Sequence, residues 1–280
     1  MKTIENLIEE LNSRGFISNA TTINKNGVEM KAINMRRTPD QKICHVVYVD
    51  RLLEDETMSV KETADFIERQ IEGKESIDIG DPSLFLQADY LKANCYIAFQ
   101  KKGSQDLIKR VSDIDENIDE YLYIKQHSGD GENFTIKITP QIVDKAGIDI
   151  DELWKAAEAN TYTSEEFNIK SLGKMIAEMS GFEVDEMPDL GDIPSIFVLS
   201  NKDLLYGSSQ LNNPLIKKWA KSHGYNKLLI IFSSIHEILI IPADEEEISL
   251  DQLEVIIGEV NSSTVAAEEQ LGDKPLIINL

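Results

Sequence analysis

The chain has 280 residues, of which 41% are hydrophobic and 28% charged, a composition that is ordinary for a globular protein and gives no sign of disorder. Its formal net charge of −22 at pH 7 repels phosphate backbones and anionic membranes, which disfavours nucleic-acid binding. The first residues lack the apolar core of a signal peptide, and no apolar run is long enough to span a membrane, so we expect a soluble cytoplasmic protein without a membrane partner.

Two cysteines, Cys44 and Cys95, stand among apolar neighbours and are expected to be free, buried thiols. They fit neither a disulfide framework nor a zinc-binding spacing. The basic residues form only short pairs, such as Lys217-Lys218, which we interpret as part of a solvated surface. We therefore expect no metal and no cofactor.

The N-terminal residues predict a helix followed by a hairpin. Apolar residues at positions 4, 7, 8 and 11 share one helical face, and Gly15 ends that helix. Asn26-Gly27 then predicts a tight hairpin turn, because both residues tolerate positive φ angles. The apolar run at 44–49 predicts a buried strand.

The middle of the chain alternates between helices and strands. Ser59 and Glu62 predict a capping box at the start of a helix. A strand is predicted at 95–99, and alternating apolar residues at 122–124 and 134–138 predict a second hairpin across a glycine-rich turn. Helices are predicted at 140–146, 149–159 and 169–179, the first of them introduced by Thr139-Pro140.

An acidic segment at 183–194, rich in proline and glycine, predicts a loop or linker. Beyond it we expect strands at 196–199, 228–232 and 235–241, and a helix before Gly224. Ser249 is expected to cap the last long helix. The apolar residues that we expect this helix to turn inward are Leu250, Leu253, Ile256, Ile257 and Val260.

Hairpins mixed with amphipathic helices, in no regular alternation, predict an α+β fold rather than a series of βαβ units. We expect two lobes, each an antiparallel or mixed sheet with hairpins packed against amphipathic helices. The division is placed near Ser128, which gives an N-terminal lobe at 1–128 and a C-terminal lobe at 129–280. The alternative is one continuous domain in which both lobes share a core.

Several short motifs occur in a specific order along the chain. They are Asn26-Gly27-Val28, Val47 to Asp50, Leu153 to Thr161, Val198 to Asn201, Tyr206-Gly207, Ser233 to Pro242 and Glu259-Val260-Asn261. In this order they resemble the bacterial family catalogued as domain of unknown function 5688. The chain departs from the family pattern at Ser164-Glu165 and Ser208-Ser209. The resemblance implies a bacterial or mobile-element protein and implies no reaction, because the family is uncharacterised.

The candidate catalytic residues are His236, Glu237, Ser233 and Ser234. If His236 and Glu237 lie in a strand, they point to opposite faces and cannot form a side-by-side dyad. Neither serine stands in the Gly-x-Ser-x-Gly elbow of a hydrolase. We therefore interpret the histidine as hydrogen-bonded near a hairpin turn, and the two hydroxyls as partners of backbone groups in that turn.

Four further polar residues are candidates for binding: Asn160, Thr161, Asn201 and Asn261. Asn160 and Thr161 are expected to end or cap a helix, with Asn160 free to adopt a left-handed conformation. The Asp113-x-Asp115-x-Asn117 motif starts like a calcium loop, but Ile118 stands where the loop needs glycine.

Three hypotheses about function remain open. The leading one is a non-enzymatic protein that binds a partner protein, possibly basic, because each catalytic template fails and the surface is acidic. Carriage on mobile elements, implied by the resemblance, would suit a regulatory or counter-defence role. The second is a hydrolase or transferase whose site collects His236, Ser233, Asn160 and Asn261. The third is an inhibitor that mimics DNA through its carboxylates.

Overall fold

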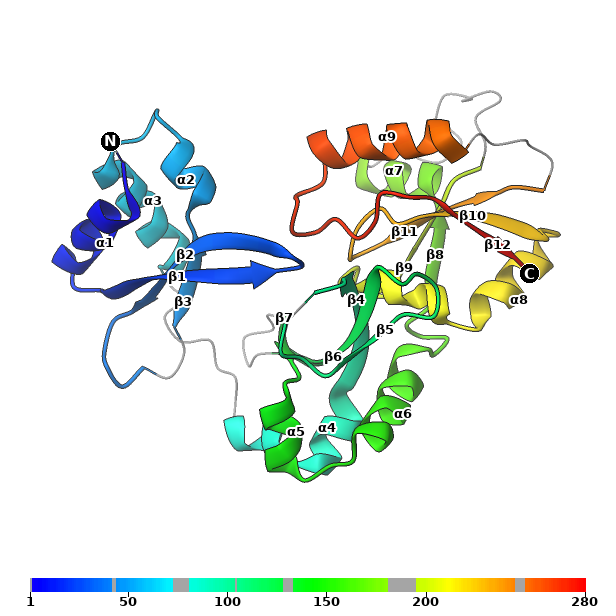
Figure 1. The fold of residues 1–280 in the computed structure, drawn as a ribbon, viewed down its shortest axis with the longest axis horizontal. Coiled ribbons are helices and arrows are strands. Elements are labelled where there is room, and N and C mark those ends of the chain that lie inside the picture. Colours follow the sequence, from blue (N-terminus) through cyan, green and yellow to red (C-terminus); the bar gives the residue numbers. More distant parts are fainter. Residues whose placement is uncertain are drawn as a thin grey trace. The chain divides into compact units, whose positions relative to one another are not determined.

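A computed structural model describes residues 2–41, 44–72, 81–103, 105–127, 133–180, 195–244 and 250–280 (Figure 1). Internal contacts divide the chain into two compact units. Unit 1 comprises residues 1–80 and 127–132, and unit 2 comprises residues 81–126 and 133–280. Both units combine antiparallel strand pairs with helices, so the predicted α+β fold is confirmed. The predicted division at Ser128 falls on a residue outside the described ranges.

Unit 1 contains a three-stranded antiparallel sheet in the order β1-β2-β3. Its strands are β1 (Ile17–Lys25), β2 (Val28–Arg36) and β3 (His45–Tyr48), and its helices are α1 (Ile4–Ser13), α2 (Asp50–Glu54) and α3 (Val60–Ile71). Asn26 and Gly27 adopt φ angles of 53° and 83°, which confirms the predicted hairpin turn. Ser59 and Glu62 form the predicted capping box of α3.

The core of unit 1 lies where α1 and α3 pack on the sheet. Its largest fully buried side chains are Leu7, Leu11, Ile33, Met35 and Ile67. A strand was predicted at 44–49 and β3 forms there, but the prediction that it is buried was wrong. β3 is an edge strand, and its residues alternate between half-buried and exposed. For the same reason the thiol of Cys44 is exposed rather than buried, whereas Cys95 is buried as predicted.

Unit 2 contains two sheets. The four-stranded sheet consists of β4 (Cys95–Lys101), β5 (Lys109–Val111), β6 (Ile118–His127) and β7 (Asn133–Lys137), with β6 pairing each of the other three. The pairing of β6 with β7 confirms the second predicted hairpin. One face of β4 packs against α6 (Ile150–Thr161). The shorter helices here are η1 (Pro82–Leu86), α4 (Ala88–Asn94) and α5 (Pro140–Ala146).

The five-stranded sheet has the order β12-β10-β11-β9-β8. Its strands are β8 (Asn168–Ser171), β9 (Phe197–Ser200), β10 (Lys227–Ile231), β11 (Ile238–Pro242) and β12 (Leu276–Asn279), all paired antiparallel. Its helices are α7 (Leu172–Ser180), η3 (Gly207–Asn212), α8 (Leu215–Ser222) and α9 (Leu250–Ser263). β8 was missed from the sequence, where a helix was predicted to start at residue 169.

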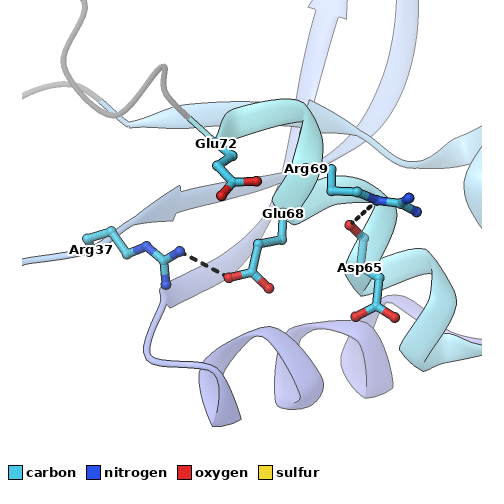
Figure 2. A pocket seen from close by; sticks show the side chains of 5 residues that line it. All are labelled: Arg37, Asp65, Glu68, Arg69 and Glu72. Atoms are coloured by element: carbon cyan, nitrogen blue, oxygen red, sulfur yellow. Dashed lines mark hydrogen bonds and ion pairs between the residues drawn. The ribbon is translucent and has the colours of Figure 1, made fainter.

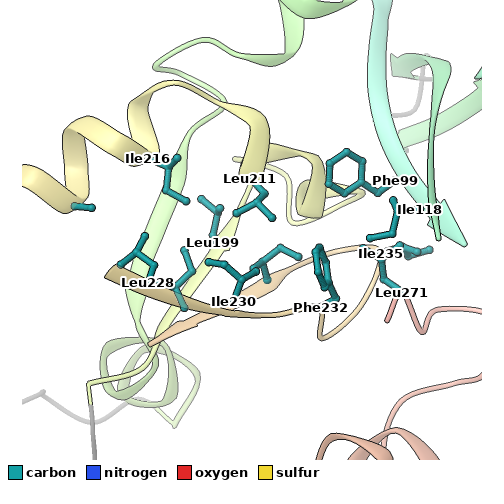
Figure 3. Close-up of a cluster of buried hydrophobic side chains, with 13 residues drawn as sticks. Phe99, Ile118, Leu199, Leu211, Ile216, Leu228, Ile230, Phe232, Ile235 and Leu271 are labelled. Atoms are coloured by element: carbon teal, nitrogen blue, oxygen red, sulfur yellow. The ribbon is translucent and has the colours of Figure 1, made fainter. Parts of the chain in front are cut away.

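Successive residues of β10 point to opposite faces of this sheet. Leu228 and Ile230 join the core that η3 and α8 cover, whereas Leu229 belongs to a second apolar cluster that includes Leu253 of α9. Figure 3 shows the first core, which continues through Phe232 to Phe99 and Ile118 of the four-stranded sheet. The two sheets of unit 2 therefore share one hydrophobic core.

The last helix differs from its prediction. α9 forms as expected, but only Ile257 among its predicted inward residues is buried. Ile256 is 52% exposed and Val260 is 47% exposed, so the prediction that they face inward was wrong. The helix contacts the sheet through a narrow stripe, and its other apolar residues remain in solvent. Three predictions lie outside the described residues: the glycine turn at 129–131, the acidic loop at 183–194 and the cap at Ser249.

Candidate functional site

The Ser233–Glu237 segment is a turn between β10 and β11. The backbone N–H of Ser234 donates to the carbonyl of Glu237 at 3.2 Å, and the hydroxyl of Ser234 accepts the backbone N–H of His236 at 3.1 Å. The predicted strand start at Ile235 was therefore wrong, since β11 begins at Ile238. His236 and Glu237 lie in this turn, where the alternation of a strand does not decide their directions.

The imidazole of His236 is held on one side by the backbone. Its Nδ1 accepts the N–H of Tyr206 at 3.2 Å, and its ring stacks on the Tyr206 ring with centroids 5.6 Å apart. Because Nδ1 is an acceptor, the neutral ring carries its proton on Nε2. Nε2 lies 3.9 Å from a carboxylate oxygen of Glu269, and 27% of the side chain is exposed.

Three further hydrogen bonds fasten the turn to its neighbours. Ser200 Oγ donates to the His236 carbonyl and Ser208 Oγ donates to the Ile235 carbonyl, both at 2.8 Å. The Ile235 N–H donates to the carbonyl of Glu269, also at 2.8 Å. The end of β9, the start of η3 and the segment after α9 thus meet at this turn. The contact between Ser200 and His236 thus joins two motifs that are distant in the sequence, Val198 to Asn201 and Ser233 to Pro242.

The loop before η3 has an unusual backbone. Leu204 and Tyr206 adopt the left-handed region, with φ angles of 56° and 57°, although neither is glycine. Asn201 closes this loop, because its side chain accepts the Leu205 N–H at 3.0 Å and donates to the Leu205 carbonyl at 2.7 Å. Such conformations cost free energy and persist only where the surroundings impose them. Here the imposing contacts are the Asn201 side chain and the His236 ring.

Beside this loop lies a group of tyrosines that sequence reasoning missed. Tyr121 and Tyr123 of β6 are buried, and their ring centroids lie 6.3 Å and 5.2 Å from that of Tyr206. Burial raises the pKa of both phenols well above its ordinary value, so they stay protonated. The signal in the sequence was the alternation of tyrosines at 121 and 123, which places both on one face of a strand.

A buried charge network adjoins the tyrosines. The ammonium of Lys125 pairs with Glu166 at 3.2 Å and also with Asp203, and it lies 5.0 Å from the centre of the Tyr96 ring. Lys202 pairs with the same Glu166 carboxylate at 3.0 Å. Glu166 is buried, and both of these ion pairs involve its carboxylate. The network fastens the Asn201–Gly207 loop to β6.

The remaining candidate residues bond to backbone groups. Asn160 donates to the carbonyls of Lys92 and Cys95 at 2.8 Å and 2.9 Å. Thr161 donates to the Ala157 carbonyl and accepts the Ile97 N–H, and Asn261 donates to the Gly272 carbonyl. Asn160 and Thr161 are the last two residues of α6, so the prediction that they end this helix is confirmed, although Asn160 does not adopt the left-handed conformation. Asn160, His236 and Asn261 are thus fixed by different neighbours.

The chemistry available at the turn is limited by these contacts. The Ser234 hydroxyl meets a backbone N–H rather than the imidazole, and burial raises the pKa of the Glu237 carboxyl. In the part of the chain that the structure describes, no group of three His, Cys, Asp or Glu side chains is placed to hold a metal ion. The arrangement joins elements of unit 2 and presents one partly exposed imidazole.

Two hollows lie away from the turn. In unit 1, a hollow of about 510 Å³ is lined by Arg37, Asp65, Glu68, Arg69 and Glu72, and Arg37 pairs with Glu68 at 3.0 Å across it (Figure 2). In unit 2, an apolar cavity of about 350 Å³ lies between η3, α8 and β12. The charged side chains of the first hollow largely neutralise one another.

The exposed face of α9 is the most distinctive surface of unit 2. We define the α9 face as the three carboxylates and three of the apolar side chains among the exposed residues of this helix: Asp251, Glu254, Val255, Ile256, Glu259 and Val260. Val255 is 62% exposed, and Ile256 and Val260 stand one helical turn apart. Apolar side chains grouped in this way on a helix, with carboxylates beside them, mark an interaction surface more often than scattered exposed residues do.

Comparisons with known proteins give one match. The model of a family of unknown function, DUF5688, matches residues 1–277. Neither the curated proteins nor the solved structures contain a match to the chain. Among the described residues, no helix is both long and apolar enough to cross a membrane. The family model covers nearly the whole chain, in agreement with the resemblance found from its motifs, and the chain therefore belongs to this DUF5688 family.

Proposed function

We propose that this chain is a non-enzymatic protein that binds a basic partner protein through the α9 face. The observation that carries the proposal is the exposure of Val255, Ile256 and Val260 beside three carboxylates on one helix. Each of these apolar side chains is at least 47% exposed, although the same helix has a sheet on which to bury them. Leaving them in water costs stability that a partner would recover.

The charge of the chain supports a basic partner. A net charge of −22 attracts cationic surfaces over a long range and raises their association rate. The apolar residues then supply the contact area, and Asp251, Glu254 and Glu259 supply the polar rim. An amphipathic helix with lysines or arginines along one edge has this complementary chemistry.

The alternative functions find less support. A hydrolase or transferase needs a base that can take the proton of its nucleophile, and Nδ1 of the candidate base His236 already accepts the Tyr206 N–H. Asn160 and Asn261 are committed to backbone carbonyls. Mimicry of DNA needs carboxylates at a regular spacing along one face, and the α9 face interrupts its carboxylates with apolar side chains. Both alternatives remain hypotheses.

We also propose that the protein acts in the cytoplasm of a bacterium or on behalf of a mobile element. The exposed free thiol of Cys44 supports a reducing compartment, because exposed thiols are oxidised outside one. A basic partner in that compartment would suit a regulatory or counter-defence role. Fractionation of the native host, with the chain recovered in the periplasm or medium, would overturn the proposed location.

The binding proposal is tested with synthetic peptides and the full chain. A fluorescent amphipathic peptide helix, with leucines on one face and lysines on the other, is titrated with the protein. Its fluorescence anisotropy is compared with that of a peptide of the same length in which glutamates replace the lysines. We expect the lysine peptide alone to bind. The double variant Ile256→Ser/Val260→Ser should weaken binding about tenfold, which corresponds to about 1.4 kcal/mol of lost apolar contact.

A matched control removes exposed apolar side chains elsewhere in unit 2. Val111 and Ile150 are 47% and 46% exposed and lie on β5 and α6. The variant Val111→Ser/Ile150→Ser should bind the lysine peptide as the unaltered chain does. Equal losses in both double variants, or equal binding of the glutamate peptide, would contradict the proposal.

A further inference from the structure

One segment of unit 2 contains basic residues but no acidic ones. Residues 204–236 contain four lysines and no aspartate or glutamate, although the whole chain has 50 acidic residues among its 280. This is the longest stretch of the chain without an acidic residue. It includes η3, α8 and β10. The acidic residues already keep the protein soluble, so solubility does not explain a local positive surface.

Three of these lysines share the outer side of α8. Lys217, Lys218 and Lys221 are exposed, whereas Ile216 and Ala220 on the opposite side are buried. Among the residues that the structure describes, no carboxylate forms an ion pair with any of the three lysines. Their charges are therefore available to an external partner.

The lysines stand apart from the aromatic residue of α8. Trp219 is half-buried and packs against the core that η3 and α8 cover, where the ring centroids of Phe197 and Tyr225 lie 4.9 Å and 5.8 Å from its own. These contacts anchor the helix on the sheet. The outer side of α8 therefore presents three cations from an anchored helix, and we name it the α8 face (Lys217, Lys218 and Lys221).

We propose that the α8 face of one molecule docks on the α9 face of a second copy of this chain. This inference rests on the proposed function, in which the α9 face binds a basic helix. The α8 helix of a second copy is one such helix. The two faces carry opposite charges. Lys217, Lys218 and Lys221 meet the carboxylates of Asp251, Glu254 and Glu259, in place of the exposed ion pair that Glu254 makes with Lys274 at 3.6 Å. The aliphatic stems of the lysines cover Ile256 and Val260.

The two faces lie on opposite sides of the five-stranded sheet. α8 packs over the side that carries Leu228 and Ile230, and α9 packs over the side that carries Leu229 (Figure 1). A contact between different faces is heterologous, so a pair of molecules still has one unused α8 face and one unused α9 face. The assembly therefore grows head to tail with concentration. A basic partner that occupies the α9 face would disassemble it.

Salt should affect this assembly in two opposing ways. At low salt the net charge of −22 on each copy opposes association. At about 0.15 M salt the Debye length falls to about 8 Å, which screens the distant charges more than the paired ones. At about 1 M salt it is about 3 Å, and the pairs themselves weaken. Association is therefore strongest at intermediate salt.

Sedimentation of the full chain tests the proposal. The weight-average mass at about 0.15 M salt should rise from the monomer value of 31.6 kDa to at least twice that value as protein concentration rises through the micromolar range. The variant Lys217→Glu/Lys218→Glu/Lys221→Glu and the variant Asp251→Lys/Glu254→Lys/Glu259→Lys should each stay monomeric. A mixture of the two should associate again, because every contact then joins opposite charges.

The control Lys61→Glu/Lys102→Glu/Lys155→Glu makes the same charge change at exposed lysines outside residues 204–236 and should associate as the unaltered chain does. An unaltered chain that stays at the monomer mass at every salt and concentration overturns the self-contact. So does a mixture that fails to associate although both variants keep the native circular dichroism spectrum. Peptide binding at the α9 face is measured in a separate experiment. If the chain binds the lysine peptide but does not self-associate, the self-contact is wrong and the proposed function is still supported.

Discussion

The Nδ1 atom of His236 accepts the backbone N–H of Tyr206 at 3.2 Å, and the two aromatic rings stack with an interplanar angle of 20°. This pair explains how a non-glycine residue is held in the left-handed region at the start of η3. The histidine that seemed the best catalytic candidate supports a strained loop. Trp154 and Trp219 both lie in unit 2, so tryptophan fluorescence reports the unfolding of the unit that contains this pair.

Replacing His236 by alanine should expose the Tyr206 amide. The N–H loses its acceptor, and a partly buried donor without a partner costs about 1–3 kcal/mol. Hydrogen exchange of the peptide that contains Tyr206 should become faster in His236→Ala, and the fluorescence unfolding midpoint should fall. His236→Asn, which keeps an acceptor near that position, serves as the control. Unchanged exchange at Tyr206 in the alanine variant would show that the contact is dispensable.

Gly207 should not tolerate a side chain. A Cβ atom there would lie 2.2 Å from Ser200 Oγ, 2.4 Å from the backbone nitrogen of Asn201 and 2.8 Å from the carbonyl oxygen of His236. We expect Gly207→Ala to destabilise unit 2 by about 3 kcal/mol or more. Gly224 also has a demanding backbone, with φ at +79°, but its Cβ would meet nothing within 4 Å. Gly224→Ala should cost only about 1 kcal/mol; a reversed order would contradict the packing.

The two lysines that share Glu166 should contribute unequally. The Lys125 side chain is 10% exposed, whereas that of Lys202 is 50% exposed. Lys125→Met leaves two carboxylates without their buried cation, and we expect a loss of about 3 kcal/mol in the free energy of unfolding. Lys202→Met removes a solvent-screened pair and should cost less than about 1 kcal/mol. Denaturant titrations followed by tryptophan fluorescence compare them, and equal losses would be inconsistent with a buried network.

Glu237 should make unit 2 less stable as pH rises. Burial raises the pKa of its carboxyl above the ordinary value of 4.5, so the folded state binds a proton more tightly than the unfolded state does. Stability is then highest below the unfolded pKa and falls as pH rises through the window up to the raised folded pKa. Glu237→Gln should therefore be more stable than the unaltered chain near neutral pH and equally stable below about pH 4. A constant difference across this range would contradict the assigned cause.

The two cysteines should differ sharply in reactivity. Cys44 is exposed, whereas burial raises the pKa of the Cys95 thiol to about 12 and leaves almost no thiolate near neutral pH. Iodoacetamide should add one group to the native chain, at Cys44, and two groups to the chain in denaturant. Mass spectrometry of Cys44→Ser should then find no adduct in the native state. Rapid labelling of Cys95 in the native chain would show that unit 2 opens readily.

Local sequence patterns determined much of the fold. The φ tolerance of Asn26-Gly27, the capping box of Ser59 and Glu62 and the strand at Cys95 each depend on neighbouring residues, and each is confirmed. The motifs around Tyr206 and Ser233 also identified the family. The strand β8 was missed because its hydrogen bonds go to β9, which is distant in the sequence. Edge position likewise exposed Cys44 in a segment whose composition predicted burial.

The tertiary structure alone decided what the candidate residues contact. The sequence predicted a hydrogen-bonded His236 near a turn, but it did not identify the Tyr206 N–H as the partner. Nor did it show that Asn160 and Asn201 bond backbone groups. The prediction of a helix at α9 is confirmed. However, the periodicity of its sequence indicates only that one side is apolar, and it does not show whether another surface covers that side. Whether an apolar side chain of a helix is buried depends on which elements pack against it. In this chain the sheet buries Ile257 and leaves Ile256 and Val260 exposed to solvent.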